Sequence, residues 1–231
     1  MTTTPPTASG YFGSMAEDYD SLIRRAVPRY EEMVERLVDY LPADPRDVLE
    51  LGCGTGALTL KLAAAFPACR LTVVDASSEM VALTRARLSE RAPEVAGRAT
   101  YLTSFFEELS VPDRSVDLVT SGISLHHVMD KSSLYRRIHG WIRPGGTFRF
   151  SDQMYGGTEG NHRINWTHWL EFCRAPGNCS EEEIESLVAH AEEHDHYVSV
   201  RDHLRLLEAA GFEPVDCVWR NNMWGIVTGE A

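Results

Sequence analysis

Three glycines alternate with other residues in the segment GCGTG at positions 52–56. Residues suited to a buried strand precede this segment and a helical pattern follows it, so its backbone could approach a nucleotide-like ligand closely. Nineteen residues past Gly56, Asp75 ends a second apolar stretch and could accept hydrogen bonds from ribose hydroxyls. The glycine spacing differs from the dinucleotide fingerprint G-x-G-x-x-G, and it favours a smaller adenosyl ligand over NAD.

Two adjacent histidines are candidates for proton transfer. His126 and His127 follow a predicted strand at 116–121, and histidine is the side chain whose ordinary pKa lies nearest to neutrality. One of them could act as a general base in catalysis. The pair could instead pack and cap the chain at this point, so both interpretations stay open.

A second group of histidines shares one polar segment: His190, His194 and His196. The first two stand four residues apart, which is a spacing at which a helix could present them to a metal ion. Acidic residues are interleaved with them, namely Glu192, Glu193 and Asp195. This pattern is more typical of a solvated helix face, and we therefore predict no metal site.

The segment 153–198 is polar and rich in His, Trp and Glu, and we interpret it as an insertion that covers the site. Its aromatic side chains could line a substrate pocket or form the core of the insertion: Trp166, Trp169, Phe172 and Tyr197. We expect a mixture of both, with substrate contacts from four residues: His162, Trp166, Trp169 and Glu171. Glu171 is thereby a third catalytic candidate.

The elements that must position these residues alternate between strands and helices. Strands are predicted at 47–51, 70–75, 99–103, 116–121 and 147–151, the last one after a turn at 143–146. Helices are predicted at 30–41, 56–65, 77–91 and 131–141, then at 165–174, 180–194 and 201–211. Two last strands, near 214–218 and 223–228, flank a turn at 220–222. The alternation implies βαβ units, and the closing hairpin makes the sheet a mixed, seven-stranded one.

Composition sets further bounds. The 231 residues suffice for one sizeable core, so we expect a disordered leader at 1–9 and a single domain at 10–231, with an N-terminal cap at 10–42 and the insertion as a lid. The net charge of −12 disfavours a nucleic-acid partner. One compact basic cluster near the N-terminus is the place where such a partner could bind: Arg24, Arg25 and Arg29.

Cysteine usage and hydropathy indicate the compartment. The five cysteines are odd in number and lack paired metal-binding spacing, and we find neither a signal peptide nor an apolar run of membrane-spanning length. These features predict a cytoplasmic protein.

Four motifs in order resemble those of class I S-adenosylmethionine-dependent methyltransferases: VLELGCGTG (48–56), VVDAS (73–77), SVDLVTSGISLHHV (115–128) and WIRPGGTFRFSD (141–152). The resemblance implies an α/β fold with a doubly wound, Rossmann-like sheet and S-adenosylmethionine across the ends of the first, second and fourth strands. The amino-acid part of the cofactor would then meet Gly52, Cys53 and Gly54, the ribose Asp75, and the adenine Ala76. Further cofactor contacts are expected from Tyr30, Glu50, Ser104, Phe105, Phe106, Ser121 and Gly122.

Other segments resemble the carboxy-S-adenosylmethionine synthases of the tRNA wobble-uridine modification pathway: LIRRAVPRY (22–30), FCRAPGNCSEEEI (172–184) and SVRDHLRLLEAAGFE (199–213). In that family the tyrosine matching Tyr30 contacts the cofactor, whereas the arginine that binds the additional carboxylate falls on Val188. Since valine cannot pair with a carboxylate, the resemblance predicts use of ordinary S-adenosylmethionine.

The leading hypothesis is a methyltransferase that acts on an O, N or C nucleophile of a small molecule, with no nucleic-acid or membrane partner. A homodimer is plausible by family analogy. One alternative is a carboxy-S-adenosylmethionine synthase or another tRNA-modification enzyme. A second alternative, from a different class, is a non-catalytic protein that binds an adenosyl ligand.

Overall fold

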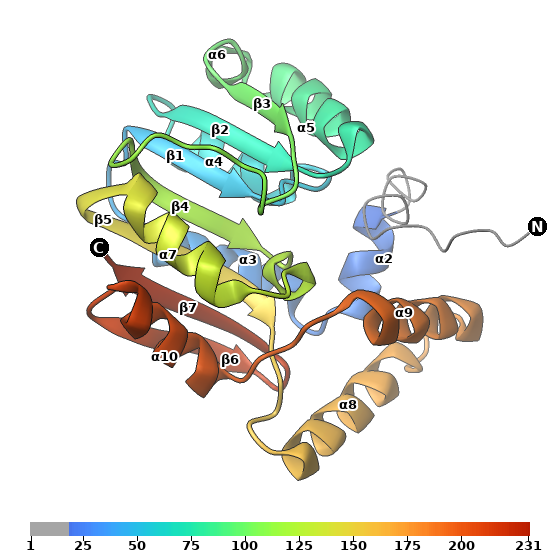
Figure 1. Ribbon diagram of the computed structural model, residues 1–231. Helices are drawn as coiled ribbons and strands as arrows, with labels where there is room; N and C mark the ends of the chain where they lie inside the picture. The colour runs from blue at the N-terminus through green and yellow to red at the C-terminus, as the bar shows by residue number, and fades with distance from the viewer. Residues whose placement is uncertain (1–18) are drawn as a thin grey trace, which may run out of the picture.

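A seven-stranded sheet forms the centre of the molecule, and its strands lie in the order β3-β2-β1-β4-β5-β7-β6 (Figure 1). The structure is a computed structural model that describes residues 19–231. The pairs from β3 to β5 are parallel, whereas β7 is antiparallel to both β5 and β6. The strands are β1 (Asp47–Leu51), β2 (Arg70–Asp75), β3 (Thr100–Thr103), β4 (Val116–Gly122), β5 (Ile142–Gln153), β6 (Val215–Asn221) and β7 (Trp224–Glu230). The predicted α/β fold with a doubly wound, mixed sheet is confirmed.

Helices cover both faces of the sheet, which is why most residues of the central strands β1 and β4 are buried in succession rather than at alternate positions. The buried residues of α3, α4 and α5 pack on one face, and those of α7 and α10 pack on the other. The helices are α2 (Tyr19–Ala26), α3 (Tyr30–Asp39), α4 (Ala57–Ala65), α5 (Ser78–Arg91), α6 (Pro93–Ala96), α7 (Lys131–Trp141), α8 (Glu159–Cys173), α9 (Glu181–His194) and α10 (Val200–Ala210), with a 3₁₀ turn η1 (Leu125–His127) after β4.

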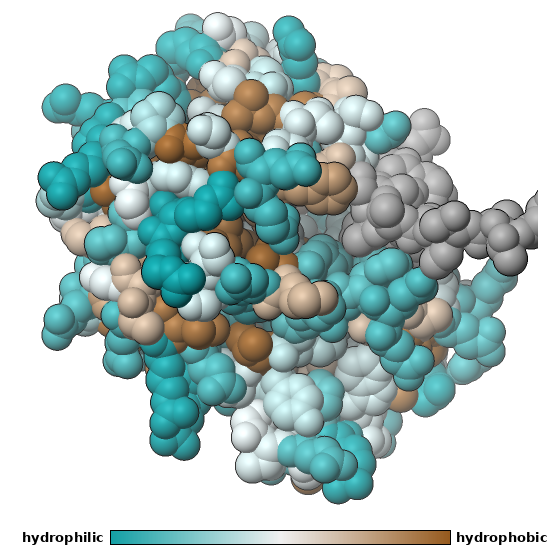
Figure 2. All heavy atoms as spheres, viewed as in Figure 1, coloured by the Kyte–Doolittle hydropathy of each residue, from teal (hydrophilic) through white to brown (hydrophobic). Residues whose placement is uncertain are grey.

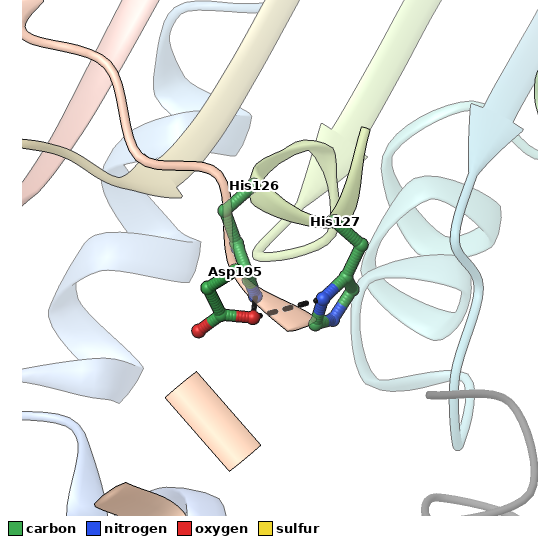
Figure 3. Close-up of side chains that lie close together, drawn as sticks. All are labelled: His126, His127 and Asp195. Carbon is green, nitrogen blue, oxygen red and sulfur yellow. Dashed lines mark ion pairs between the residues drawn. The ribbon is translucent and has the colours of Figure 1, made fainter. Parts of the chain in front are cut away.

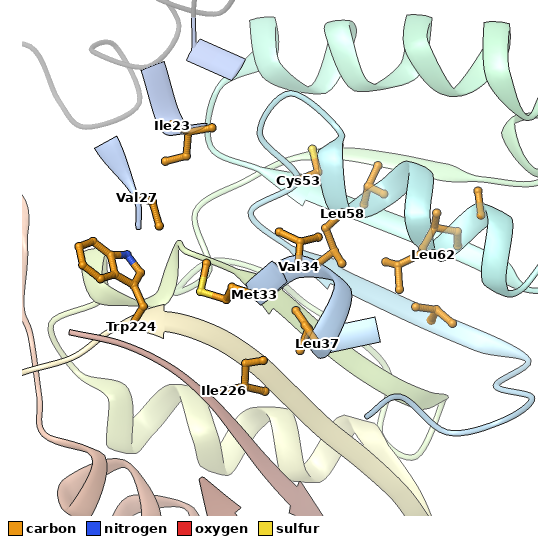
Figure 4. Packing of buried hydrophobic residues seen from close by; sticks show 14 of the residues in the cluster. Ile23, Val27, Met33, Val34, Leu37, Cys53, Leu58, Leu62, Trp224 and Ile226 are labelled. Carbon is orange, nitrogen blue, oxygen red and sulfur yellow. The ribbon is translucent and has the colours of Figure 1, made fainter. Parts of the chain in front are cut away.

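The core beneath α3 and α4 connects the N-terminal helices with the last strand. Met33 and Leu37 of α3 are fully buried and lie between Leu62 of α4 and Ile226 of β7 (Figure 4). Burial of one such side chain stabilises the fold by about 1.5–3 kcal/mol. This packing fixes the start of α3 next to the carboxyl ends of the central strands.

Three segments differ from the predicted elements. Residues 143–146, predicted as a turn, form a bulge inside β5, because the pairing with β4 skips from Ile142 to Thr147. Helix α8 begins at Glu159 instead of near Asn165, since the Thr158 side chain accepts a hydrogen bond from the Asn161 backbone and caps the helix earlier. The hairpin between β6 and β7 turns at 222–223, one to two residues later than predicted.

The insertion consists of α8 and α9, which lie beside α2 near the carboxyl ends of the parallel strands (Figure 1). The Trp169 indole donates a hydrogen bond of 2.9 Å to the backbone oxygen of Ala26. Arg25 forms two hydrogen bonds to the Glu183 carboxylate, at 2.7 and 2.8 Å. Because Glu183 also closes the capping box of α9 with Ser180, one carboxylate both starts this helix and ties it to α2.

Hydrophilic side chains cover most of the face seen in Figure 2, with smaller hydrophobic areas between them. Among residues 19–231, none of the helices combines the length and the apolar character needed to cross a bilayer. The predicted leader at 1–9 and the first part of the predicted cap, 10–18, lie outside the described residues.

Candidate active site

The glycine loop leaves the end of β1 in a conformation that residues with side chains rarely adopt. Gly52, Gly54 and Gly56 have φ values of +74°, +49° and +89°, a region in which glycine is favoured. At Gly52 space is also lacking, because an added Cβ would lie 2.3 Å from the Ser124 Oγ. The backbone N–H groups of Gly52 and Cys53 donate to the Val74 oxygen at 2.8 and 3.0 Å. The loop is therefore closed onto the neighbouring strand β2.

Asp75 at the end of β2 holds this loop in place. One of its oxygens accepts a hydrogen bond from the Gly54 N–H and the other from the Ser77 N–H, both at 2.9 Å. Each carboxylate oxygen has a second lone pair, so Asp75 can still accept hydrogen bonds from a ligand. Burial raises the pKa of Asp75 despite these bonds. Its predicted role on a ribose and a structural role in the loop are thus compatible.

A cavity of about 220 Å³ opens at the carboxyl ends of β1, β2 and β4. Most of the predicted cofactor residues line it: Tyr30, Glu50, Gly52, Cys53, Gly54, Asp75, Ala76, Phe105, Phe106 and Gly122. Two do not. The Ser104 hydroxyl donates to the Phe105 oxygen, and the buried Ser121 hydroxyl donates to the Leu51 oxygen, so both support the cavity from outside its wall.

Several other lining residues were not predicted, among them Tyr19, Ile23, Ile123, Ser124 and Ser151, whereas His127 lines the cavity and was predicted as a catalytic candidate. The clearest omission from the predicted site is the stretch directly after β4. There Ile123 has a φ of +55°, and the chain turns back towards the glycine loop. A β-branched residue in this region is strained. Such strain is found where the chain is held for a purpose other than regular structure.

The buried carboxyl group of Glu50 lines one part of this cavity. Its side chain is fully buried, Thr59 donates a 2.6 Å hydrogen bond to one of its oxygens, and the other oxygen has no hydrogen-bond partner within residues 19–231. Burial raises the pKa of Glu50 to about 8. An unpaired buried carboxyl group of this kind fits a ligand that carries an ammonium group. Asp75, Phe105 and Phe106 line the same cavity as Glu50, and their carboxylate and aromatic groups are of the kinds that suit the ribose and the base of S-adenosylmethionine.

A second cavity, of about 70 Å³, lies next to the first and shares Tyr19, Ile23 and Ile123 with it. Its apolar wall includes Trp169 of α8 and Trp224 of β7. Its polar lining residues are His126, Gln153, His190, Asp195 and Tyr197. The insertion, α2 and the sheet therefore all contribute to this cavity.

Between the two cavities, His126, His127 and Asp195 form a largely buried group that we call the His–Asp cluster (Figure 3). The Nδ1 of His127 lies 3.0 Å from Asp195 Oδ1, and the Nε2 of His126 lies 3.7 Å from the same oxygen. On its other side, the His126 Nδ1 is 2.6 Å from Asp152 Oδ1. The Tyr197 hydroxyl donates to Asp195 Oδ2.

Opposing effects set the charges of this cluster. Burial lowers the pKa of His126, but the carboxylates of Asp152 and Asp195 outweigh burial and hold that pKa above its ordinary value. Burial and the charge of His126 lower the pKa of His127. Burial raises the pKa of Asp195, but the charge of His126 and the contact with His127 outweigh burial and lower this pKa to about 2. The cluster therefore combines an ionised carboxylate, a histidine that favours its charged form and a histidine that favours its neutral form.

Other predicted site residues lie elsewhere. Glu171 is on the exposed side of α8 and lines neither cavity, so the structure does not bring it to the histidines. His162 stacks on Tyr155, with ring centroids 4.1 Å apart, and also lines neither cavity. His190 differs from the predicted solvated face, since it is buried and its Nε2 lies 3.9 Å from Asp195 Oδ1.

The predicted basic cluster is neutralised by acidic neighbours. Arg24 pairs with Glu31, Arg25 with Glu183 and Arg29 with Glu32, at 2.6, 2.7 and 2.5 Å. Each positive charge thus has a carboxylate next to it. The arginines that the sequence offered as a place for a nucleic-acid partner therefore each share their charge with a carboxylate.

The comparisons with known proteins agree with this geometry. The family described as "Methyltransferase domain" matches residues 48–146, which includes the glycine loop, Asp75 and the histidine pair. Carboxy-S-adenosyl-L-methionine synthase of Geobacter metallireducens is 27% identical over 201 residues, which cover 84% of this chain and 81% of that protein.

Two further relatives match over different shares of their length. Malonyl-[acyl-carrier protein] O-methyltransferase of Priestia megaterium is 27% identical over 140 residues. The match covers 61% of this chain but only 48% of that protein. Phosphoethanolamine N-methyltransferase 2 of Haemonchus contortus, solved with phosphomonomethylethanolamine and S-adenosylhomocysteine, has a TM-score of 0.69 at 15% identity; the match covers 96% of this chain and 59% of that one. At this identity the structural likeness shows the fold alone.

Proposed function

Since the chain belongs to the class I S-adenosylmethionine-dependent methyltransferases, we propose that it transfers a methyl group to an oxygen, nitrogen or carbon nucleophile of a small molecule. The observation that carries this proposal is the junction of the two cavities. They share part of their walls, and His127 of the first adjoins His126 of the second, with ring centroids 4.0 Å apart. A cofactor and an acceptor could meet at this junction.

On the cofactor side, the chain provides binding and orientation. When bound, S-adenosylmethionine supplies a methyl group that its sulfonium already activates for displacement. Glu50 would hold the ammonium group, Asp75 the ribose hydroxyls, and Phe105 and Phe106 the adenine. The backbone at Gly52 fits a close approach, because no side chain stands between the loop and the cavity. Alignment of the reactants and exclusion of water are the main tasks of such a site.

On the acceptor side, the second cavity supports a small molecule that is partly apolar. The indole of Trp224 and the amide of Gln153 each have a buried nitrogen without a hydrogen-bond partner within residues 19–231. Two unpaired donors in one cavity favour an acceptor that carries a carbonyl or carboxylate group. The His–Asp cluster, next to the junction, would favour the deprotonated form of the nucleophile.

The likeness to carboxy-S-adenosylmethionine synthases does not extend to the residue that would recognise their product. Val188 of α9 is half-buried and packs against the apolar core. A hydrocarbon side chain in that position has no means of pairing with an additional carboxylate. This observation favours ordinary S-adenosylmethionine.

Calorimetry with purified, cofactor-free protein tests the proposal. We expect micromolar-range affinity for S-adenosylmethionine, a strong loss in Asp75→Ala, and release of S-adenosylhomocysteine with members of a panel of small carboxylate and carbonyl compounds. Absence of binding heat would refute the cofactor assignment. Mass spectrometry of ligand retained through purification identifies the competing function, because the carboxylated cofactor is heavier.

A further inference from the structure

The His–Asp cluster has the donor atoms and the spacing of a metal site. The histidines come from η1, directly after β4, and the carboxylate comes from the segment that follows α9. One ligand atom from each of the three residues lies within 4.8 Å of the others. Bonds of about 2.0–2.2 Å to a tetrahedral ion place two ligand atoms roughly 3.4 Å apart. The distances from Asp195 Oδ1 to the two histidines, 3.0 and 3.7 Å, bracket that value.

The surrounding residues orient two of the three ligands, His126 and Asp195. Asp152 is fully buried and contacts the Nδ1 of His126, which favours a proton on that nitrogen, so Nε2 is the atom that would bind an ion once the ion displaces its proton. Tyr197 occupies one oxygen of Asp195 and leaves Oδ1 facing the histidines. Metal-binding histidines in proteins commonly donate their other ring N–H to a carboxylate of this kind, to a backbone carbonyl or to water.

We propose that His126, His127 and Asp195 bind a divalent transition-metal ion. Two imidazoles and one carboxylate favour Zn²⁺, Fe²⁺ or Co²⁺ over Mg²⁺ and Ca²⁺, which prefer oxygen ligands throughout. His190 is the nearest further imidazole, with its ring centroid 5.4 Å from that of His127. Three ligands from the chain leave at least one position for an exogenous ligand.

The role of the ion rests on the proposed function, whereas its binding does not. An acceptor hydroxyl next to the ion would lose its proton to solvent more readily, because the ion stabilises the negative oxygen. The oxygen then forms a bond to the methyl carbon, and the carbon–sulfur bond breaks with its electron pair remaining on sulfur. The ion is neither oxidised nor reduced.

Cobalt binding to the full-length protein tests the site without an activity assay. Protein treated with a chelator is titrated with Co²⁺, followed by visible absorption and by metal analysis. We expect one Co²⁺ ion per chain, with the visible absorption bands of a Co²⁺ ion that has a low coordination number. Sulfur-to-cobalt charge-transfer absorption should be absent, which separates this site from adventitious binding to cysteines. Wild-type protein that takes up no stoichiometric Co²⁺ or Zn²⁺ would overturn the proposal.

Variants locate the ion within the chain. Asp195→Asn and His126→Gln should lose at least about 100-fold in Co²⁺ affinity, and Asp152→Asn should lose about 10–100-fold because it acts through His126. His168→Gln, an exposed histidine of α8, is the matched control and should bind as wild type does. Equal affinity in Asp195→Asn and wild type would refute the assignment.

S-adenosylmethionine binding, measured on the same samples, serves two purposes. It shows that each variant is folded, and it separates the two proposals. Intact cofactor binding without metal uptake rejects the metal site alone, whereas metal uptake without cofactor binding rejects the proposed function.

Discussion

The two sides of the cavity junction are built in different ways. The motif residues of the cofactor side come from one short segment, residues 50–56, and from Asp75 on the adjacent strand. The acceptor side joins His126 to Asp195, which are 69 residues apart and belong to a strand end and to the insertion. The first side depends on local backbone geometry, and the second depends on how α8 and α9 pack. Changes on the two sides should therefore differ in what they disturb.

The largest effect is expected at the glycine loop. Gly52→Ala adds a Cβ that would lie 2.3 Å from Ser124, which is itself held by hydrogen bonds to Leu51 and Ser121. The loop must shift, and we expect S-adenosylmethionine affinity to fall by at least about 100-fold, or about 3 kcal/mol. Calorimetry measures this loss.

Gly177→Ala is the matched control for that substitution. Gly177 also has a positive φ, +87°, but its added Cβ would meet no atom within 4 Å. The positive φ alone costs about 1 kcal/mol of stability. Cofactor affinity in this control should be unchanged, and a comparable loss in both variants would show that backbone strain, not the crowded contact with Ser124, explains the result.

An effect of comparable size is expected on the acceptor side. Asp195→Asn leaves the cofactor cavity intact, because Asp195 lines only the second cavity. We expect the turnover number to fall by about 10²–10⁴, the range for loss of a group that assists proton removal, with little change in cofactor affinity. Release of S-adenosylhomocysteine with the identified acceptor measures turnover, and the exposed neighbour Glu193→Gln is the control. A parallel loss of cofactor affinity would contradict the separation of the two sides.

The contrast between the two sides also explains what could be predicted from the sequence. The strands at 47–51 and 70–75 and the helix at 131–141 agree with the structure residue by residue, because apolar patterning, glycine and capping residues act locally. The motif residues that line the first cavity could be predicted for the same reason. Its motif residues are neighbours in the chain or on adjacent strands.

The second side could not be predicted in this way, because tertiary packing decides it. Asp195 was assigned to a solvated face, yet the insertion turns it onto the histidines, where its side chain is 5% exposed. Glu171 was predicted as a site residue only because it belongs to the insertion. In the structure, α8 is turned so that Glu171 is exposed to solvent while Trp169 is buried in the core. No local pattern distinguishes these outcomes when the direction of the insertion is unknown.

A third prediction concerns the pH dependence of stability at Glu50. Burial raises the pKa of this carboxyl group to about 8, above its ordinary 4.5, so the folded protein without ligand binds the proton more tightly than the unfolded chain. Its contribution is therefore most favourable below about pH 4.5 and is lost as the pH rises towards 8. Glu50→Gln removes this dependence.

We therefore expect Glu50→Gln without cofactor to be more stable than wild type by several kcal/mol at pH 8, and the difference to shrink at pH 5. Urea unfolding at both pH values measures it. Cofactor affinity should fall at least about tenfold at pH 7.5, since the ammonium group loses its carboxylate. A stability difference that does not change with pH would refute the raised pKa.

The smallest effect is expected where the insertion is attached. Arg25 binds the Glu183 carboxylate and also donates to the Asn178 backbone oxygen at 2.8 Å, so Arg25→Ala removes three hydrogen bonds between α2 and the start of α9. The pair is about one-third exposed, and we expect a loss of about 1–2 kcal/mol in the free energy of unfolding. Arg25 lowers the pKa of Glu183 to about 2.

The lowered pKa of Glu183 determines the pH range in which its pair with Arg25 stabilises the fold. Its contribution is fully present above the ordinary pKa of about 4.5 and is lost as the pH falls towards 2, so wild type and Arg25→Ala should converge in stability in acid. Arg24→Ala is the control, because its pair with Glu31 is about half exposed and should contribute less than about 0.5 kcal/mol. If Arg25→Ala also weakens Co²⁺ binding while S-adenosylmethionine binds as before, the position of the insertion controls only the acceptor side. Equal weakening of both ligands would instead show that the two sides form one cooperative unit.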